Sequence, residues 1–518
     1  MGPLSVISYI PALAAAALFL YTVVELLRHR LRLNLPPGPT PWPIIGNLNL
    51  LGRLPHRSLA DLARTYGPIM YLQLGSRPAV VASSIDAAQL FLRTHDLAFA
   101  SRPRTAAGKH TAYGHSTMTW SPYGPYWRFS RKLYLTELFS DKRLASFRYI
   151  HTEEVRELVR SLHSAGRKPV VLRESLWRLT AGIICRMALG RKYVDFDVGD
   201  DRPEIVSPEE FREMLDELFL LNGVPVLGDS IPWLGWLDVG GYVRRMKAVA
   251  RRLDGFLERV LEESRGRLKG EVGAGAAKSL LDLLLRFAED PTADVELSVD
   301  QVKALTMEII AGGTESSSLN MEWAMSEMLR RPEVLMKATE EVDAVVGKER
   351  MVEEEDLASL PYIEAIVKET LRLHPAAPIL TPHLSREHCN VAGYDLPSGT
   401  RLLVNVWAIQ NDPAVWEDPA EFRPERFTGA KKGVDVSGQE FELLPFGAGR
   451  RMCPGIRLAM KVIQLTLATL VHAFSWELPS GMTPPQVDME ELLGLTLKRK
   501  VQIQAIAVPR LASHVYQI

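Results

Sequence analysis

Residues 445–455 read Pro-Phe-Gly-Ala-Gly-Arg-Arg-Met-Cys-Pro-Gly, and this stretch decides the fold. The glycines at 447, 449 and 455 let the backbone turn tightly and approach a flat ligand closely, and Phe446 can pack beside the sulfur of Cys453. We expect a helix from about residue 455 to 473, which places backbone amides and the positive end of a helix next to that sulfur. Both features favour the thiolate, which is the form of cysteine that binds metals, so Cys453 is a candidate metal ligand.

The chain has only three cysteines, Cys185, Cys389 and Cys453. Three are too few for a disulfide framework in a chain of 518 residues, and the number fits a reducing compartment. We interpret Cys185 and Cys389 as small buried hydrophobic residues. Chemistry at cysteine therefore rests on Cys453 alone.

A second motif lies in a helix expected over residues 302–329. It contains Gly312 and Gly313, followed by Glu315 and Ser316. Each glycine inside a helix costs about 1 kcal/mol, so the pair needs a reason, such as a ligand pressed against the helix or a widened turn. A carboxyl and a hydroxyl beside such a gap can relay protons. Taken alone, however, the motif also fits a solvated Glu and Ser on an amphipathic helix.

These motifs resemble the cytochrome P450 family, whose haem-binding signature is matched by Phe446, Gly449, Arg451, Cys453 and Gly455. The resemblance implies a mainly α fold with small β regions built around haem b, with Cys453 as the iron ligand. Thiolate ligation promotes cleavage of the O–O bond, which is how the family activates O2. The resemblance makes Glu315 the catalytic acid and Ser316 the catalytic alcohol. Many members have threonine at the alcohol position, so coupling of electrons to product can be looser here.

Further residues match the family's haem-supporting positions. Trp127 and Arg131 fit a W-x-x-x-R helix motif whose spacing puts both on one face, and Arg451 belongs to the cysteine signature. Arg102 and His383 look similar to additional partners of the haem propionates. Core packing for Trp127 and a surface charge for Arg102 are the plainer alternatives. A final group resembles the family's Glu-Arg-Arg triad, which we assign to folding and haem retention: Glu369, Arg372 and Arg426.

The start of the chain predicts a membrane anchor. Residues 1–24 carry no charge, and residues 4–24 are long enough to cross a bilayer as a helix. The basic cluster follows this segment instead of preceding it, which favours a retained anchor with the rest of the chain in the cytosol. We divide the chain into an anchor (1–27), a basic and proline-rich hinge (28–46) and a monooxygenase domain (47–518). A soluble core helix is the alternative for residues 4–24.

Elsewhere the pattern predicts one large, mainly helical domain. Strands are expected at residues 69–74 and 79–82 near the start, and at 401–406 and 501–505 near the end. Helical spacing dominates from about 141 to 373, with loops expected only at 194–210 and 271–278.

The resemblance is closest to plant microsomal members, among them flavonoid 3'-hydroxylase-like and homoterpene-forming enzymes. It implies insertion of one oxygen atom from O2 into a lipophilic phenolic or terpenoid metabolite at the endoplasmic reticulum membrane. No nucleotide-binding fingerprint is evident, so electrons are expected from NADPH–cytochrome P450 reductase. Basic residues between 128 and 142 are candidates for its docking face, and a plain solvated helix surface is the alternative. A net charge of −1 argues against nucleic acid as a partner. The alternatives are a haem-thiolate isomerase or dehydratase, an enzyme that cleaves a C–C bond of a terpenoid alcohol, and a non-catalytic haem sensor.

Overall fold

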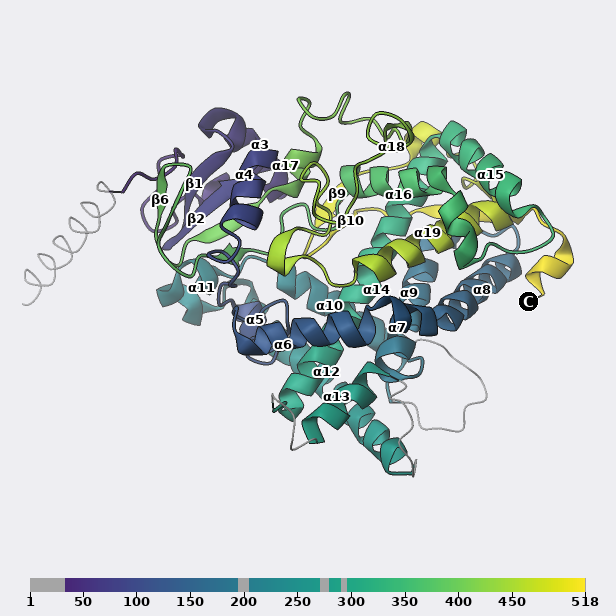
Figure 1. The fold of residues 1–518 in the computed structure, drawn as a ribbon, viewed down its shortest axis with the longest axis horizontal. Helices are drawn as coiled ribbons and strands as arrows, with labels where there is room; N and C mark the ends of the chain where they lie inside the picture. Colours follow the sequence, from purple (N-terminus) through teal and green to yellow (C-terminus); the bar gives the residue numbers. More distant parts are fainter. Residues whose placement is uncertain (1–32, 194–204, 271–278, 290–295, 518) are drawn as a thin grey trace, which may run out of the picture.

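The computed structural model describes residues 33–193, 205–270, 279–289 and 296–517 (Figure 1). The expected anchor and the first part of the hinge lie outside this range. Among the described residues, only α19 (Ile456–Ala473) is long and apolar enough to span a membrane, and 67% of that window is buried inside the protein. We therefore interpret α19 as a core helix.

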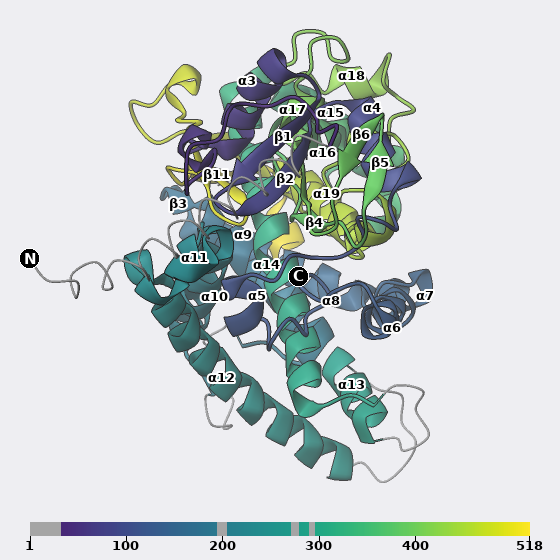
Figure 2. The same ribbon diagram turned by 90° about the vertical axis from the view of Figure 1, so that its left-hand side faces the viewer.

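The mainly helical architecture is confirmed, and helix α14 (Val299–Arg330) runs through its middle (Figure 2). Its start is fixed by a capping box, in which Ser298 and Gln301 each accept a hydrogen bond from the other's backbone amide. It packs against α9 (Leu172–Leu189) and α19. The longer helices around this centre are α3 (Pro55–Tyr66), α6 (Pro125–Leu133), α8 (Arg148–Ala165), α10 (Pro208–Gly223), α12 (Tyr242–Gly270), α13 (Leu280–Glu289), α15 (Pro332–Val346) and α16 (Pro361–Leu373).

The largest sheet joins the two ends of the chain. Its strand order is β1 (Ile69–Leu74), β2 (Arg77–Ala82), β7 (Arg401–Val404), β4 (His383–Leu384). Strands β2 and β7 are parallel, and the other pairs are antiparallel. This pairing carries His383, far along the sequence, to the same region as the segment that follows β2.

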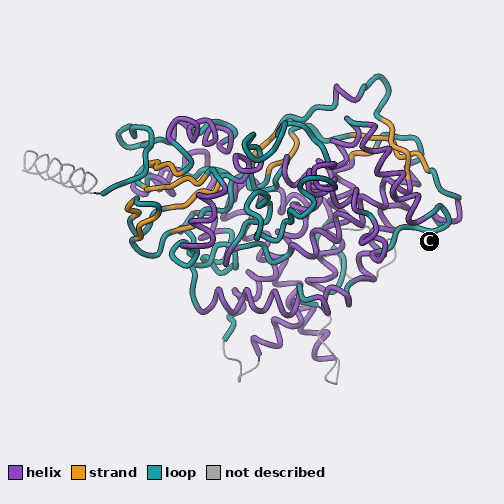
Figure 3. The backbone as a smooth tube through the Cα atoms, turned by 45° about the horizontal axis from the view of Figure 1, so that its top comes forward, coloured by secondary structure: helices purple, strands orange, loops and turns teal. Residues whose placement is uncertain are grey.

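Smaller sheets lie at the surface of the helical body (Figure 3). One contains β3 (Val170–Val171), β11 (Gln504–Pro509) and β8 (Phe474–Glu477), and two hairpins are formed by β9 (Glu491–Leu493) with β10 (Leu497–Arg499) and by β5 (Cys389–Val391) with β6 (Tyr394–Leu396). Cys389 is only half-buried on β5, so the expectation of a buried residue holds for Cys185 alone.

Several boundaries differ from the sequence predictions. The last long strand begins at Gln504, not at 501, because its partners β3 and β8 set its extent. Part of the loop expected over 194–210 is helical, since α10 starts at Pro208 with Ser207 as its cap, and residues 194–204 are outside the described range. The loop expected at 271–278 also lies outside it. A further break at residues 224–241, rich in proline and glycine, contains only short helices: α11 (Leu227–Ser230), a 3-10 turn over Pro232–Leu237 and another over Val239–Gly241.

Candidate active site

A cavity of about 170 Å³ lies between α14, α9 and the cysteine loop, which we define as residues 445–455. Helix α14 lines it with Glu308, Ile309, Gly312, Gly313, Ser316 and Ser317, and the cysteine loop contributes Phe446, Cys453, Pro454 and Gly455. The structure therefore brings the two sequence motifs together around one space.

The cysteine loop is held in place by an unusual backbone conformation and by an acid from another segment. Gly449 has φ +67°, and a Cβ there would lie 2.4 Å from the carbonyl oxygen of Leu92, so only glycine fits. The next residue, Arg450, forms an ion pair with Asp96 at 2.6 Å. The amide of Cys453 donates to the carbonyl of Phe446 at 3.0 Å, which closes the loop beside the cavity.

The protonation preference of Cys453 differs from the sequence expectation. Burial raises the pKa of the Cys453 thiol, and this outweighs the amide of Gly455 and the charge of Arg131, which both lower it. Loop amides and the helix end are therefore too weak to form the thiolate by themselves. A bound cation would supply the missing stabilisation, because metal coordination deprotonates a thiol.

Beside the cavity, three arginines gather without a carboxylate partner. Among the described residues, Arg102, Arg131 and Arg451 form no ion pair, although Arg102 is buried and the other two are half-buried. Burial and mutual repulsion lower the pKa of Arg451 to about 8, and burial lowers that of Arg102 to about 9. Unpaired buried cations are costly. The cluster thus fits a ligand with two carboxylates, as haem b has.

Trp127 and His383 complete this cluster. The guanidinium carbons of Arg451 and Arg131 lie 4.5 and 5.7 Å from the centre of the Trp127 ring, whose buried Nε1–H has no hydrogen-bond partner. His383 is buried, and its Nδ1–H donates to the carbonyl of Phe99 at 3.0 Å. Burial and the nearby arginines hold its pKa well below the usual value. The five residues predicted for the propionates are thereby assembled from four separate segments, because Trp127 and Arg131 share α6.

Helix α14 is α-helical along its whole length, so the widened turn suggested by the glycine pair is absent there. The two glycines have different roles. A Cβ on Gly313 would lie 2.4 Å from Cδ1 of Ile184 on α9, so Gly313 allows close helix packing. A Cβ on Gly312 would meet nothing within 4 Å, because Gly312 faces the cavity.

Ser316 and Glu315 lie on different sides of α14. The Ser316 hydroxyl donates to the carbonyl of Gly312 at 2.8 Å and lines the cavity. Glu315 is 6% exposed and lines a neighbouring pocket of about 550 Å³. Its Oε1 accepts from Thr496 at 3.0 Å and its Oε2 has no partner. Burial raises the pKa of Glu315 to about 7. The acid and the alcohol are adjacent in sequence but do not share one cavity.

Glu308 was missed by sequence reasoning. Its carboxylate accepts the backbone amides of Met118 and Thr119 at 2.7 and 2.6 Å, and burial raises its pKa. The signal was present, because residues 308, 312 and 316 are spaced by four and share a helix face.

The predicted structural triad is close-packed and buried. Arg372 donates to both carboxylate oxygens of Glu369, at 2.7 and 2.8 Å, and Arg426 lies 3.3 Å from the same carboxylate. Arg372 also binds the carbonyl oxygens of Gln410 and Pro419. This network ties α16 to the chain that leads to the cysteine loop.

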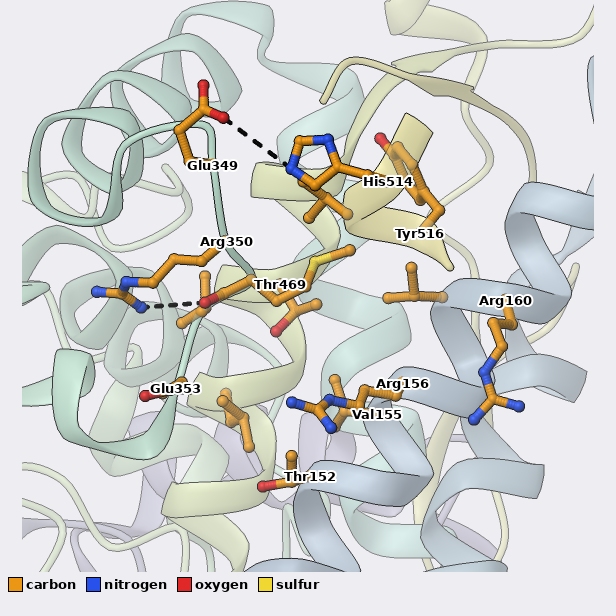
Figure 4. A pocket seen from close by; sticks show the side chains of 15 residues that line it. Thr152, Val155, Arg156, Arg160, Glu349, Arg350, Glu353, Thr469, His514 and Tyr516 are labelled. Carbon is orange, nitrogen blue, oxygen red and sulfur yellow. Dashed lines mark hydrogen bonds and ion pairs between the residues drawn. The ribbon is translucent and has the colours of Figure 1, made fainter. Parts of the chain in front are cut away.

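A separate cavity of about 270 Å³ lies between α8, α19 and the chain end (Figure 4). One of its arginines, Arg350, is paired with Asp356 at 2.6 Å, and Cys453 is not among the lining residues. This cavity is therefore distinct from the candidate active site.

Comparison with known proteins agrees with this geometry. The family model described as Cytochrome P450 matches residues 36–505. The chain is 52% identical to trimethyltridecatetraene synthase of Zea mays (93% of this chain, 90% of the relative) and 45% identical to flavonoid 3'-monooxygenase of Petunia hybrida (96% and 99%). A zebrafish cytochrome P450 structure with abiraterone superposes with a TM-score of 0.74 at 25% identity, covering 89% of this chain and 100% of that one. These relatives do not favour the isomerase or dehydratase alternative. The chain belongs to the cytochrome P450 family of haem-dependent monooxygenases, which use O2 and electrons derived from NADPH, and it is similar to the plant flavonoid 3'-monooxygenases and homoterpene synthases.

Proposed function

We propose that Cys453 ligates the iron of haem b, that Trp127, Arg131, Arg451, Arg102 and His383 hold its propionates, and that the enzyme oxygenates an uncharged lipophilic metabolite. The observation that carries this proposal is the group of unpaired arginines beside a cavity that also contains Cys453. Bound haem supplies the iron chemistry that activates O2. Phe446 and Gly455 shield the sulfur, since both line the cavity next to it.

An uncharged substrate is favoured by the cavity lining. The lining is rich in apolar groups such as Ile183, Ile184 and Ile309. Both carboxylate oxygens of Glu308 are occupied by backbone amides, so this acid is not free to pair with a substrate cation. The relatives are named as flavonoid monooxygenases and as synthases of branched hydrocarbons, and both names fit a phenolic or terpenoid substrate.

For proton delivery, we propose that Ser316 works at the cavity and Glu315 works from the pocket behind it. The Ser316 hydroxyl can hold and move a proton at its Oγ, since it faces the cavity beside Gly312. Glu315, with a pKa near 7, is able to hold and release a proton at neutral pH.

The membrane proposal rests on residues 4–24 and on one exposed surface. The segment after Ser230 lies beside the turn that follows β1, because the amide of Ser76 donates to the carbonyl of Ser230 at 2.8 Å. Large aromatic side chains are exposed in this segment and near residue 42. Their exposed fractions are 65% for Trp42, 60% for Trp233 and 79% for Trp236. Such residues suit the interface of a bilayer. We infer a single-pass anchor at the endoplasmic reticulum, with this surface as a second contact.

Electrons would arrive on another face. The basic side chains exposed along α6 and the start of α7 (Asp141–Ser146) are Arg128, Lys132 and Lys142. Asp141 forms an ion pair at 2.6 Å with Arg457, which follows the cysteine loop, so this face lies near that loop. We propose this face as the docking site for NADPH–cytochrome P450 reductase, whose acidic groups it would complement.

The direct test is to express the full chain with NADPH–cytochrome P450 reductase in microsomes and to supply flavonoids, acyclic terpenoids and fatty acids with isotopically labelled O2. We expect a product that carries one labelled oxygen atom from an uncharged phenolic or terpenoid substrate. Turnover without O2, or preference for a charged fatty acid, would contradict the proposal.

A further inference from the structure

One wall of the active-site cavity is formed by a segment without regular secondary structure. Residues 111–121, which we call the 111–121 segment, are all turns and bends, and two non-glycine residues in it, Tyr113 and His115, have positive φ. Met118 and Thr119 of this segment line the cavity. Because no helix or sheet ladder defines its path, other contacts must position this wall.

Charged side chains bind every backbone polar group of Met118 and Thr119. On one side, Glu308 accepts both amides, each with a different carboxylate oxygen. On the other side, the carbonyl of Met118 accepts from Arg451 at 2.9 Å, and the carbonyl of Thr119 accepts from Arg102 at 3.1 Å. The backbone donors and acceptors of these two residues thus lie between one anion and two cations.

The chemistry favours an acid at position 308. Charge-assisted hydrogen bonds are stronger than neutral ones, and the dipoles of the two enclosed residues point from the arginines toward the carboxylate. Glutamine would offer one oxygen and one NH2 group, so one amide would face a donor. The hydroxyl of Tyr134, which donates to the carbonyl of Leu305 at 2.8 Å, also lies 3.3 Å from Oε2 of Glu308.

We propose that Glu308 is a positioning residue that sets the substrate-facing wall by holding Met118 and Thr119 against Arg102 and Arg451. The same two arginines are assigned to the haem propionates. Arg102 and Arg451 would therefore contact both the 111–121 segment and the haem. This inference rests on the proposed function for the role of those arginines. It adds a determinant of substrate selection on α14 that acts through the 111–121 segment.

The test compares Glu308→Gln and Glu308→Ala with a matched control, Glu341→Gln. Glu341 likewise accepts two backbone amides, those of Tyr362 and Ile363 at 2.7 and 3.0 Å, but it lies on α15 outside the cavity lining. In the haem-loaded proteins, hydrogen exchange is measured at residues 117–121. The binding of 4-phenylimidazole is followed by the shift of the haem absorption band.

We expect amides 118 and 119 to exchange roughly 10- to 100-fold faster in both Glu308 variants, the factor that corresponds to losing a buried charge-assisted hydrogen bond. We also expect roughly 10-fold weaker 4-phenylimidazole binding and a KM that rises more than kcat falls. The optical signature of the reduced carbonyl complex should persist. Glu341→Gln should leave all of these values at the wild-type level.

Unchanged exchange at residues 117–121 in Glu308→Gln, or equal effects in Glu341→Gln, would overturn the proposal. If Glu308→Ala does not fold, the Gln variant decides alone, because it preserves side-chain volume. Failure of the proposed function would be seen separately, as wild-type protein that oxygenates no substrate, whereas exchange and 4-phenylimidazole titration test Glu308 without turnover.

Discussion

The guanidinium of Arg451 lies over the ring of Trp127, 4.5 Å from its centre, while the indole Nε1–H of Trp127 stays buried without an acceptor. Arg451 donates three of its five N–H groups to the carbonyl oxygens of Ala100, Met118 and Ser121, and no carboxylate balances its charge. A cation and a donor are therefore both left for an anionic ligand. This is the arrangement that the edge of a haem would complete.

Arg131→Leu should weaken haem retention more than protein stability. Arg131 makes one backbone hydrogen bond, to Met452 at 2.7 Å, and burial lowers its pKa more than the nearby Cys453 and Asp96 raise it. We expect roughly 10-fold faster haem loss from the variant, the effect of removing about 1.4 kcal/mol of charge-assisted binding. Transfer of haem to apomyoglobin measures the rate. Arg128→Leu, an exposed position on the same helix, is the control, and equal haem loss from both variants would contradict the assignment.

The two glycines of α14 should respond in opposite ways to alanine. Gly313→Ala places a methyl group 2.4 Å from Ile184 Cδ1 and should lower the free energy of unfolding by about 1–3 kcal/mol. Gly312→Ala meets no neighbour within 4 Å and should stabilise the haem-free helix by up to about 1 kcal/mol. Urea unfolding of the haem-free proteins checks both values. Equal destabilisation by both substitutions would refute the different roles of the two glycines.

Stability should depend on pH through Glu315. Burial raises its pKa to about 7 in the folded state, above the ordinary value of 4.5. The folded protein then keeps a proton that the unfolded chain has lost, so the free energy of unfolding falls as pH rises from about 4.5 to 7. Glu315→Gln should remove this part of the slope. Urea unfolding at several pH values measures it, with Glu213→Gln, an exposed acid of the same pocket, as the control. If the pH dependence of the free energy of unfolding were unchanged in Glu315→Gln, burial would not raise the pKa of this carboxyl.

Proton delivery should depend on both members of the acid and alcohol pair. We expect Glu315→Ala combined with Ser316→Ala to lower the product formed per NADPH consumed by roughly tenfold or more, since general acid catalysis commonly contributes that much. Ser316→Thr keeps the hydroxyl and should retain product formation. The ratio of product to NADPH and hydrogen peroxide measures the coupling. Full coupling in the double variant would remove both residues from the mechanism.

Local patterns were sufficient to predict the elements around the active site. The cysteine loop, the helix after it and the strand at Ile69–Leu74 follow from glycine placement and periodicity, which depend on neighbours in sequence. The start of β11 could not be predicted in this way, because residues 170–171 and 474–477 decide where it pairs.

The electrostatics of the site depend on tertiary contacts and were less predictable. The sequence motif suggested a thiolate at Cys453, whereas burial raises the pKa of the thiol. The adjacent residues Glu315 and Ser316 face different spaces because helical neighbours point about 100° apart. The role of Glu308 depends on its contact with the 111–121 segment, whose residues are about 190 positions away in the sequence.

The most direct test of the central claim is the absorption spectrum of the reduced carbon monoxide complex of the purified protein, compared with that of Cys453→Ser. We predict the band characteristic of thiolate-ligated haem in the wild type and its disappearance in the variant, with Cys389→Ser unchanged. A wild-type protein without haem, or a thiolate band that survives in Cys453→Ser, would contradict the account.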